Sequence, residues 1–275
     1  MNRFKGLVLL CGVALLSFGC GAEQAKETPL GADQAPAPKA PSGPTGRIHG
    51  IVRFKGNKPR AAVETINQDQ KTCGENHSVP RLVLSKNDGV QRAFVYLDGV
   101  ASVQDLRPRQ PVLIDQKDCQ YAPQAVTVPV GTKLEITNSD PILHNVHGQE
   151  MTGEGLQTIF NVAQPVRGQH TIIEPGLSRP GIVALTCEAG HPWMTAYVFV
   201  ANHPYAAVTN DEGEFVIPDV PVGTYKIKMW HEGVTMKRNI KTLQRYEYED
   251  PYEITQEVVV QDGADAVVNF ELTLR

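Results

Sequence analysis

Apolar and polar residues alternate over short stretches along most of this chain, and no segment keeps an apolar period of 3.6 residues. Each stretch is bounded by Gly, Pro, Asn or Asp, which favour turns. The pattern predicts a nearly all-β protein built as sandwiches rather than as parallel βαβ units. The expected strands are 48–54, 93–97, 125–130, 133–137, 181–186, 196–200, 214–217, 224–230, 257–260 and 266–274.

The first 19 residues have the composition of an export signal. Arg3 and Lys5 form a basic start, and residues 6–19 follow as an uncharged apolar run. This run is too short to span a bilayer as a helix, so residues 1–19 are expected to be a cleaved signal peptide.

The end of the signal resembles the lipobox of bacterial lipoproteins, although Ser17 replaces the usual leucine. The resemblance implies cleavage before Cys20, lipid attachment at its sulfur and a periplasmic protein anchored to a membrane. Gly21 is not the Asp that retains some lipoproteins in the inner membrane, which favours the outer membrane. Ordinary secretion is the alternative. Residues 20–45, rich in Pro and Ala, are expected to be a tether.

The net charge bears on the kind of partner, and the cysteines bear on the cell compartment. The formal net charge is −4 and no basic stripe appears, which argues against a nucleic-acid partner. Of five cysteines, Cys11 leaves with the signal and Cys20 carries the lipid. In an oxidising compartment the remaining three suggest one disulfide and one thiol. Cys73 and Cys119, in polar turn-like sequence, are the expected pair. Cys187 follows an apolar strand, as a metal thiolate would.

Two motifs supply the donor atoms of a copper site. One is Cys187-Glu-Ala-Gly-His191-Pro-Trp-Met194, and the other ends in His144-Asn145. One thiolate, two imidazoles and a weak axial thioether are the ligands of a blue-copper electron-transfer centre. We therefore expect one type 1 copper ion held by His144, Cys187, His191 and Met194.

Other metal sites and ligands are weaker hypotheses. A dinuclear copper site needs a second thiolate in the loop, and structural zinc needs a stronger fourth ligand than methionine. His147 is expected on the opposite strand face, at solvent or at an edge. His231 and the pair Cys73 and His77 have little nearby support. Trp193 either packs in the core or forms an apolar docking surface.

Residues 111–202 resemble the cupredoxin fold, the Greek-key β-sandwich of plastocyanin and amicyanin. Their loop 187–194 is similar to the amicyanin copper loop, with one residue added between Cys187 and His191. The resemblance implies that Asn145 anchors the ligand loop by hydrogen bonding. It also suggests a respiratory or dehydrogenase redox partner.

A second resemblance covers residues 208–230, which look like the carboxypeptidase-regulatory-like, or transthyretin-like, β-sandwich. That module usually opens with a Gly-x-Val-x-x-x-Gly strand, and residues 50–56 have this form. Residues 89–97 are a plausible second strand.

These resemblances allow two domain layouts. In the first, a copper domain of residues 111–202 is inserted into a discontinuous transthyretin-like sandwich made of 46–110 and 203–275. In the second, an elaborated cupredoxin of residues 46–202 precedes a C-terminal module.

The sequence thus predicts a lipid-anchored, periplasmic, mononuclear blue-copper protein that carries single electrons between redox proteins. No hydrolase elbow, zincin motif, phosphate loop or dinucleotide fingerprint appears, so an enzyme is not expected. The alternatives are a copper-handling protein, a type 2 copper enzyme and a metal-free interaction lipoprotein.

Overall fold

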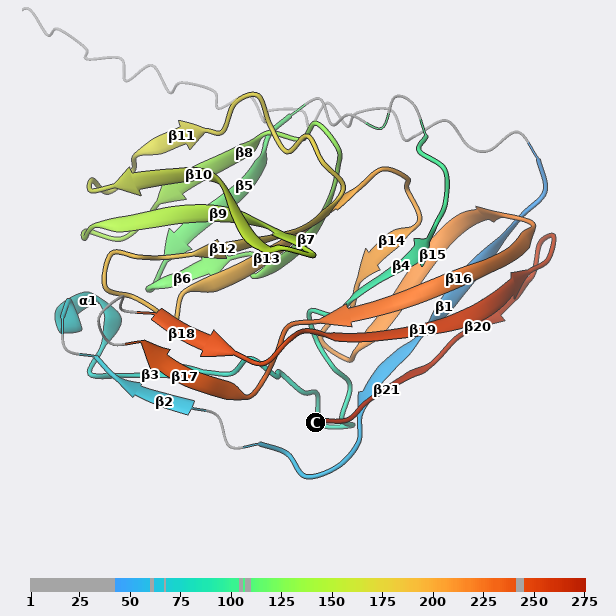
Figure 1. Cartoon of the computed structure of the whole chain (residues 1–275), viewed down its shortest axis with the longest axis horizontal. Coiled ribbons are helices and arrows are strands. Elements are labelled where there is room, and N and C mark those ends of the chain that lie inside the picture. Colours follow the sequence, from blue (N-terminus) through green and yellow to red (C-terminus); the bar gives the residue numbers. More distant parts are fainter. Residues whose placement is uncertain (1–42, 60–61, 67, 104–105, 107–109, 241–244) are drawn as a thin grey trace, which may run out of the picture. The chain divides into compact units, whose positions relative to one another are not determined.

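The computed structural model describes residues 43–275 except 60–61, 67, 104–105, 107–109 and 241–244 (Figure 1). This part of the chain is nearly all β, as predicted, with 21 strands and a single four-residue helix. None of its helices has the length and apolar character needed to cross a membrane. The predicted signal peptide, Cys20 and most of the tether lie outside the described residues.

Strands β5 to β13 form two sheets, here called the middle sandwich. Their order is β10-β9-β12-β13-β7 in one sheet and β11-β8-β5-β6 in the other. Ile114 and Ile136 of the second sheet share a buried core with Leu185 and Val198 of the first, so the sheets pack face to face. The strands are β5 (Val112–Lys117), β6 (Gln120–Ala122), β7 (Ala125–Pro129), β8 (Leu134–Asn138), β9 (His144–Thr152), β10 (Gly155–Gln164), β11 (His170–Ile172), β12 (Gly181–Thr186) and β13 (Thr195–Ala201).

A second pair of sheets, here called the outer sandwich, combines strands from the two ends of the described chain. β1 pairs with β15, β20 and β21, and the other sheet has the order β14-β4-β16-β19. Figure 1 shows blue β1 beside red β20 and β21. The strands are β1 (Thr45–Phe54), β4 (Phe94–Asp98), β14 (Ala206–Val208), β15 (Glu214–Pro221), β16 (Gly223–His231), β19 (Tyr252–Val260), β20 (Asp265–Val267) and β21 (Phe270–Leu272).

Strand pairing keeps the two sandwiches separate. Within the described residues, each sheet of four or more strands draws its members either from 112–201 or from the segments on both sides of it. Such pairing is what an inserted domain requires, since the flanking segments must complete one sandwich together. We therefore propose that the middle sandwich is inserted into the outer sandwich.

One segment before the middle sandwich nevertheless packs into it. Two short hairpins, β2 (Ala62–Thr65) with β3 (Asn76–Val79) and β17 (Met236–Ile240) with β18 (Arg245–Tyr248), belong to neither pair of large sheets. The turn between β2 and β3 carries helix α1 (Gln70–Cys73). Its Ile66 and Cys73 are buried in the core of the middle sandwich, and Cys73 forms a disulfide with Cys119, as predicted.

Candidate metal centre

Strand pairing in the middle sandwich brings the predicted ligands to one edge. His144 is the first residue of β9, and Cys187 follows β12 directly. β9 and β12 are antiparallel neighbours, with His147 opposite Thr186. The start of β9 therefore lies beside the end of β12. His191 and Met194 come from the loop that joins β12 to β13.

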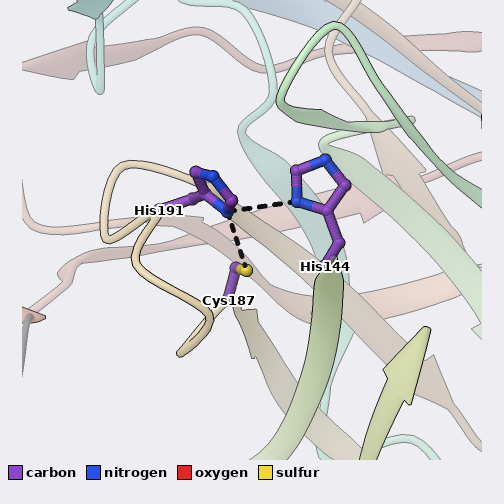
Figure 2. Close-up of side chains that lie close together, drawn as sticks. All are labelled: His144, Cys187 and His191. Carbon is purple, nitrogen blue, oxygen red and sulfur yellow. Dashed lines mark hydrogen bonds between the residues drawn. The ribbon is translucent and has the colours of Figure 1, made fainter. Parts of the chain in front are cut away.

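Three of the predicted ligand atoms converge in the interior (Figure 2). The Nδ1 atoms of His144 and His191 are 3.2 Å apart, and Cys187 Sγ lies 3.7 Å from His191 Nδ1. One nitrogen from each ring and the sulfur all lie within 4.8 Å of one another. Both imidazoles are 0 % exposed and Cys187 is buried. The set could hold a single metal ion shielded from water.

Each imidazole is bound to a carboxylate at its other nitrogen. His144 Nε2 lies 2.9 Å from Asp140 Oδ2, and His191 Nε2 lies 3.2 Å from Asp69 Oδ2. Asp140 is buried and also accepts bonds of 2.9 Å from the backbone N–H groups of Asp118 and Cys119. An ionised carboxylate only accepts hydrogen bonds, so each Nε2 carries the proton. Histidine ligands of metals are commonly oriented in this way.

The contacts of the two rings leave one nitrogen of each for a cation. Burial, together with the neighbouring His144, lowers the pKa of His191 to about 4, so the ring is neutral near pH 7. The Nε2 atoms contact carboxylates, so Nδ1 is the nitrogen that each ring leaves available to a metal ion. The residues present therefore fit a metal ion.

The sulfur is placed to become a thiolate when metal binds. Burial raises the pKa of the Cys187 thiol, while hydrogen bonds from the backbone N–H groups of Asn145, Ala189 and His191 oppose this rise. Such amide donors stabilise the anion. In the described residues Cys187 is the only cysteine outside a disulfide. Cys119 also lies near Asp140 and His144, but its sulfur is bonded to Cys73.

Asn145 makes the contact that the resemblance implied. Its Oδ1 accepts a 2.5 Å hydrogen bond from the backbone N–H of Glu188, and its Nδ2 donates to Asn161 Oδ1 at 2.7 Å. The Tyr121 hydroxyl donates to the Asn145 carbonyl oxygen at 2.6 Å. These bonds tie β9 to the ligand loop and to β6.

Met194 is buried in the same loop as Cys187 and His191. Its backbone N–H donates to the His191 carbonyl oxygen at 3.0 Å, and its carbonyl oxygen accepts from the Cys187 N–H at 3.3 Å. These bonds hold the loop closed. The role of the Met194 sulfur as an axial ligand stays a prediction.

Trp193 packs in the core and does not form a docking surface. It is buried, and its indole N–H donates to the Cys119 carbonyl oxygen at 3.0 Å. Its ring lies edge-on to His191, with 5.3 Å between centroids. Of the two hypotheses for this residue, the structure supports packing.

The other histidines lie away from the converging atoms. His147 was expected at solvent or at an edge, and this is wrong: it is buried, because Glu188 of the ligand loop and Thr158 of β10 cover its ring. Its two ring nitrogens contact Glu188 and Thr158 at 2.9 and 2.7 Å. His231 is buried at the end of β16, where its Nδ1–H donates to the Glu232 carbonyl oxygen at 2.8 Å. The side chain of His77 is not among those described.

Sequence reasoning missed both carboxylates. Asp140 lies four residues before His144, in the same turn, so its short spacing offered a signal. Asp69 is separated from His191 by 122 residues and belongs to no motif. Only the folded path of the β2–β3 turn brings it to the site.

Comparison with known proteins finds solved structures that resemble part of this chain. No family model matches the chain, and no curated protein matches it. Similar solved structures include a purple cupredoxin from Nitrosopumilus maritimus, which is 22% identical over 33% of this chain and 99% of that chain, with a TM-score of 0.28. A Cu-containing nitrite reductase from Thermus scotoductus SA-01 is 21% identical over 37% of this chain and 24% of that chain, with a TM-score of 0.28. A reduced amicyanin mutant is 18% identical over 39% of this chain and 98% of that chain, with a TM-score of 0.27. Similarity at this level adds nothing to what the geometry of the site shows.

Proposed function

We propose that this chain is a mononuclear copper protein that carries single electrons between redox partners. His144, Cys187 and His191 would hold the ion, with Met194 as a weak axial ligand. The observation that carries the proposal is the convergence of one buried thiol and two imidazole Nδ1 atoms within 4.8 Å of one another. Bound copper would supply one-electron redox chemistry, which this soft sulfur and nitrogen set suits.

The surrounding residues support electron transfer because they limit movement and exclude water. Asp140 and Asp69 fix the two rings, and the Asn145 bond to Glu188 fixes the loop that carries Cys187. Ligands held in this way stay in place when the ion changes charge, which keeps the cost of reorganisation low.

Burial of the site favours a carrier over a copper enzyme. A catalytic metal keeps a position open to substrate, whereas both imidazoles here are fully covered. A copper-handling protein could share the same ligands, and it differs from a carrier by exchanging its ion readily.

The rest of the predicted biology remains part of the proposal. We place the protein on the periplasmic side of a bacterial membrane, anchored through Cys20, with redox proteins and not nucleic acid as partners. The Cys73–Cys119 disulfide supports an oxidising compartment. The outer sandwich would serve as a transthyretin-like scaffold or docking module.

Visible absorption and electron paramagnetic resonance of the purified protein loaded with Cu(II) test the proposal. We expect an intense thiolate-to-copper band and narrow copper hyperfine splitting, both lost reversibly on reduction. Cys187→Ser should abolish the colour, while His147→Gln should keep it. A colourless wild-type protein, or a Cys187→Ser variant that keeps the band, contradicts the assignment.

A further inference from the structure

The outer edge of His191 is covered by a segment distant in sequence. The ring presents Nδ1 to the candidate centre, and its Nε2 lies 3.2 Å from the carboxylate of Asp69. Asp69 belongs to the turn between β2 and β3, whose described residues 66 and 68–75 are here called the cap. With the cap in place the His191 side chain is 0 % exposed.

Four contacts hold the cap against the middle sandwich. Ile66 is buried in the core of that sandwich. Gln68 Nε2 donates to the Ala189 carbonyl oxygen, in the ligand loop, at 2.8 Å. At Gly190 (φ +87°) an added Cβ would lie 1.6 Å from Gln68 Nε2, so a side chain there would displace the Gln68 amide from the ligand loop. The fourth contact is the disulfide from Cys73.

That disulfide connects the supports of both histidines. At one end, the Cys73 N–H donates to the Asp69 carbonyl oxygen at 2.9 Å. At the other end, the Cys119 N–H donates at 2.9 Å to Asp140, which holds His144. Asp69 itself has φ 56°, a left-handed conformation that its neighbours in the cap must maintain.

We propose that the cap is a disulfide-held closure of the metal centre and that Asp69 is the positioning residue for His191. This inference rests on the proposed copper function. In this arrangement Asp69 fixes the Nε2–H tautomer, so that Nδ1 is always available to the metal. The cap also blocks the edge by which an ion would exchange with solution.

Two measurable effects distinguish the proposed roles of Asp69 and the cap from simple packing. The Asp69 charge beside His191 stabilises the higher charge of Cu(II), so its removal should raise the reduction potential. Closure by the cap should slow the release of copper. A neutral amide at position 69 keeps the shape of the cap and removes the charge, whereas alanine removes both the charge and the contact.

The experiment compares Asp69→Asn, Asp69→Ala and Cys73→Ser/Cys119→Ser with wild type. Glu75→Gln serves as the control, since it removes an exposed carboxylate from the same cap. Copper release to a strong chelator is timed for each copper-loaded protein, and the reduction potential is measured by titration. We expect release at least tenfold faster in Asp69→Ala and in the cysteine pair variant, and a higher potential in Asp69→Asn. Release and potential equal to those of wild type in both Asp69 variants would overturn the proposal.

A second readout needs no copper. In the metal-free protein Cys187 is buried under the ligand loop, so its alkylation by iodoacetamide reports opening of the site. We expect faster alkylation in Asp69→Ala and no change in Glu75→Gln, with circular dichroism confirming the fold. If wild type fails to bind copper but Asp69→Ala still speeds alkylation, the copper function fails and the closure stands. An equal rate in all variants rejects the closure.

Discussion

The Oδ1 atom of Asn145 accepts a hydrogen bond from the backbone N–H of Glu188, a residue 43 positions further along the chain. The two residues directly follow His144 and Cys187, so this bond fixes the separation of two proposed ligands. Asn145→Ala should lower the free energy of unfolding by about 1–3 kcal/mol, because it leaves a partly buried donor without its acceptor. Urea unfolding of the metal-free protein measures this loss.

The neighbouring Asn161 provides the control for that measurement. Its side chain is exposed and bonds to Asn145 Nδ2 and to Glu188. Because water can reach this exposed position and replace Asn161 Oδ1 as the acceptor, Asn161→Ala should cost less, about 0.5–1 kcal/mol. Equal losses in the two variants would show that the bond to the Glu188 N–H has no special part in holding the loop.

The sequence predicted strands that alternate between buried and exposed positions and strands that are continuously apolar. The predicted strand 214–217 opens β15, where exposed and buried side chains alternate, and the predicted strand 181–186 is β12, a mostly buried strand at the centre of its sheet. β10 was not predicted: its first five residues all face solvent at the edge of the sheet, and only residues 160–164 alternate between exposed and covered positions. Helix α1 has only four residues, too few for an apolar period of 3.6 to appear.

The donor atoms of the site and the Asn145 anchor could be predicted, but Asp69 could not. The spacing of Cys187 and His191 within one loop is visible in the sequence, and so is the position of His144 after a strand and a Pro-containing turn. Asp69 reaches His191 only through the disulfide-linked cap, and no local pattern reports such a long-range contact. The same is true of His147, whose burial depends on the ligand loop and on strand β10.

The disulfide should contribute strongly to stability. Cys73 and Cys119 are 46 residues apart, and loop-closure entropy for that length predicts about 4 kcal/mol. Cys73→Ala/Cys119→Ala should lower the free energy of unfolding by roughly this amount in urea, at unchanged β content. Wild type unfolded in the presence of a reducing dithiol should approach the variant. A loss below about 1 kcal/mol would mean that the buried contacts of the cap hold it without the covalent bond.

A buried ion pair between two segments outside the middle sandwich also contacts Tyr197 of β13. The guanidinium of Arg81 is paired with the carboxylate of Glu232. It also donates hydrogen bonds to the Tyr197 hydroxyl at 2.8 Å and to the Gly233 carbonyl oxygen at 2.7 Å. Its central carbon lies 3.7 Å from the centre of the Tyr248 ring. Removing one member of the pair leaves the other as a buried charge without a partner. We expect Arg81→Met or Glu232→Gln to cost about 3–5 kcal/mol in denaturant unfolding.

The double variant and an exposed pair complete this test. Arg81→Met/Glu232→Gln should cost clearly less than the two single losses added together, because no charge is left unpaired. Arg238, in an exposed pair with Glu247, gives the comparison, and Arg238→Met should cost below about 1 kcal/mol. Strictly additive losses at Arg81 and Glu232 would show that the pair is not energetically coupled.

His231 should make the protein less stable in mild acid. Burial lowers its pKa to about 4, and the positive charges of Arg81 and Arg92 add to this effect, while its hydrogen bond to the Glu232 backbone opposes it. Between pH 6.5 and 4 the unfolded chain therefore binds a proton that the folded chain does not. The free energy of unfolding should fall as the pH drops through this window, by at most about 3 kcal/mol from this residue.

His231→Asn, whose side-chain amide can replace the Nδ1–H donor, should lose that part of the pH dependence, whereas His49→Asn, at a half-exposed position, should keep it. Urea unfolding of the metal-free protein at pH 7, 6, 5 and 4 decides the matter, and parallel curves for wild type and His231→Asn would exclude His231 as the source.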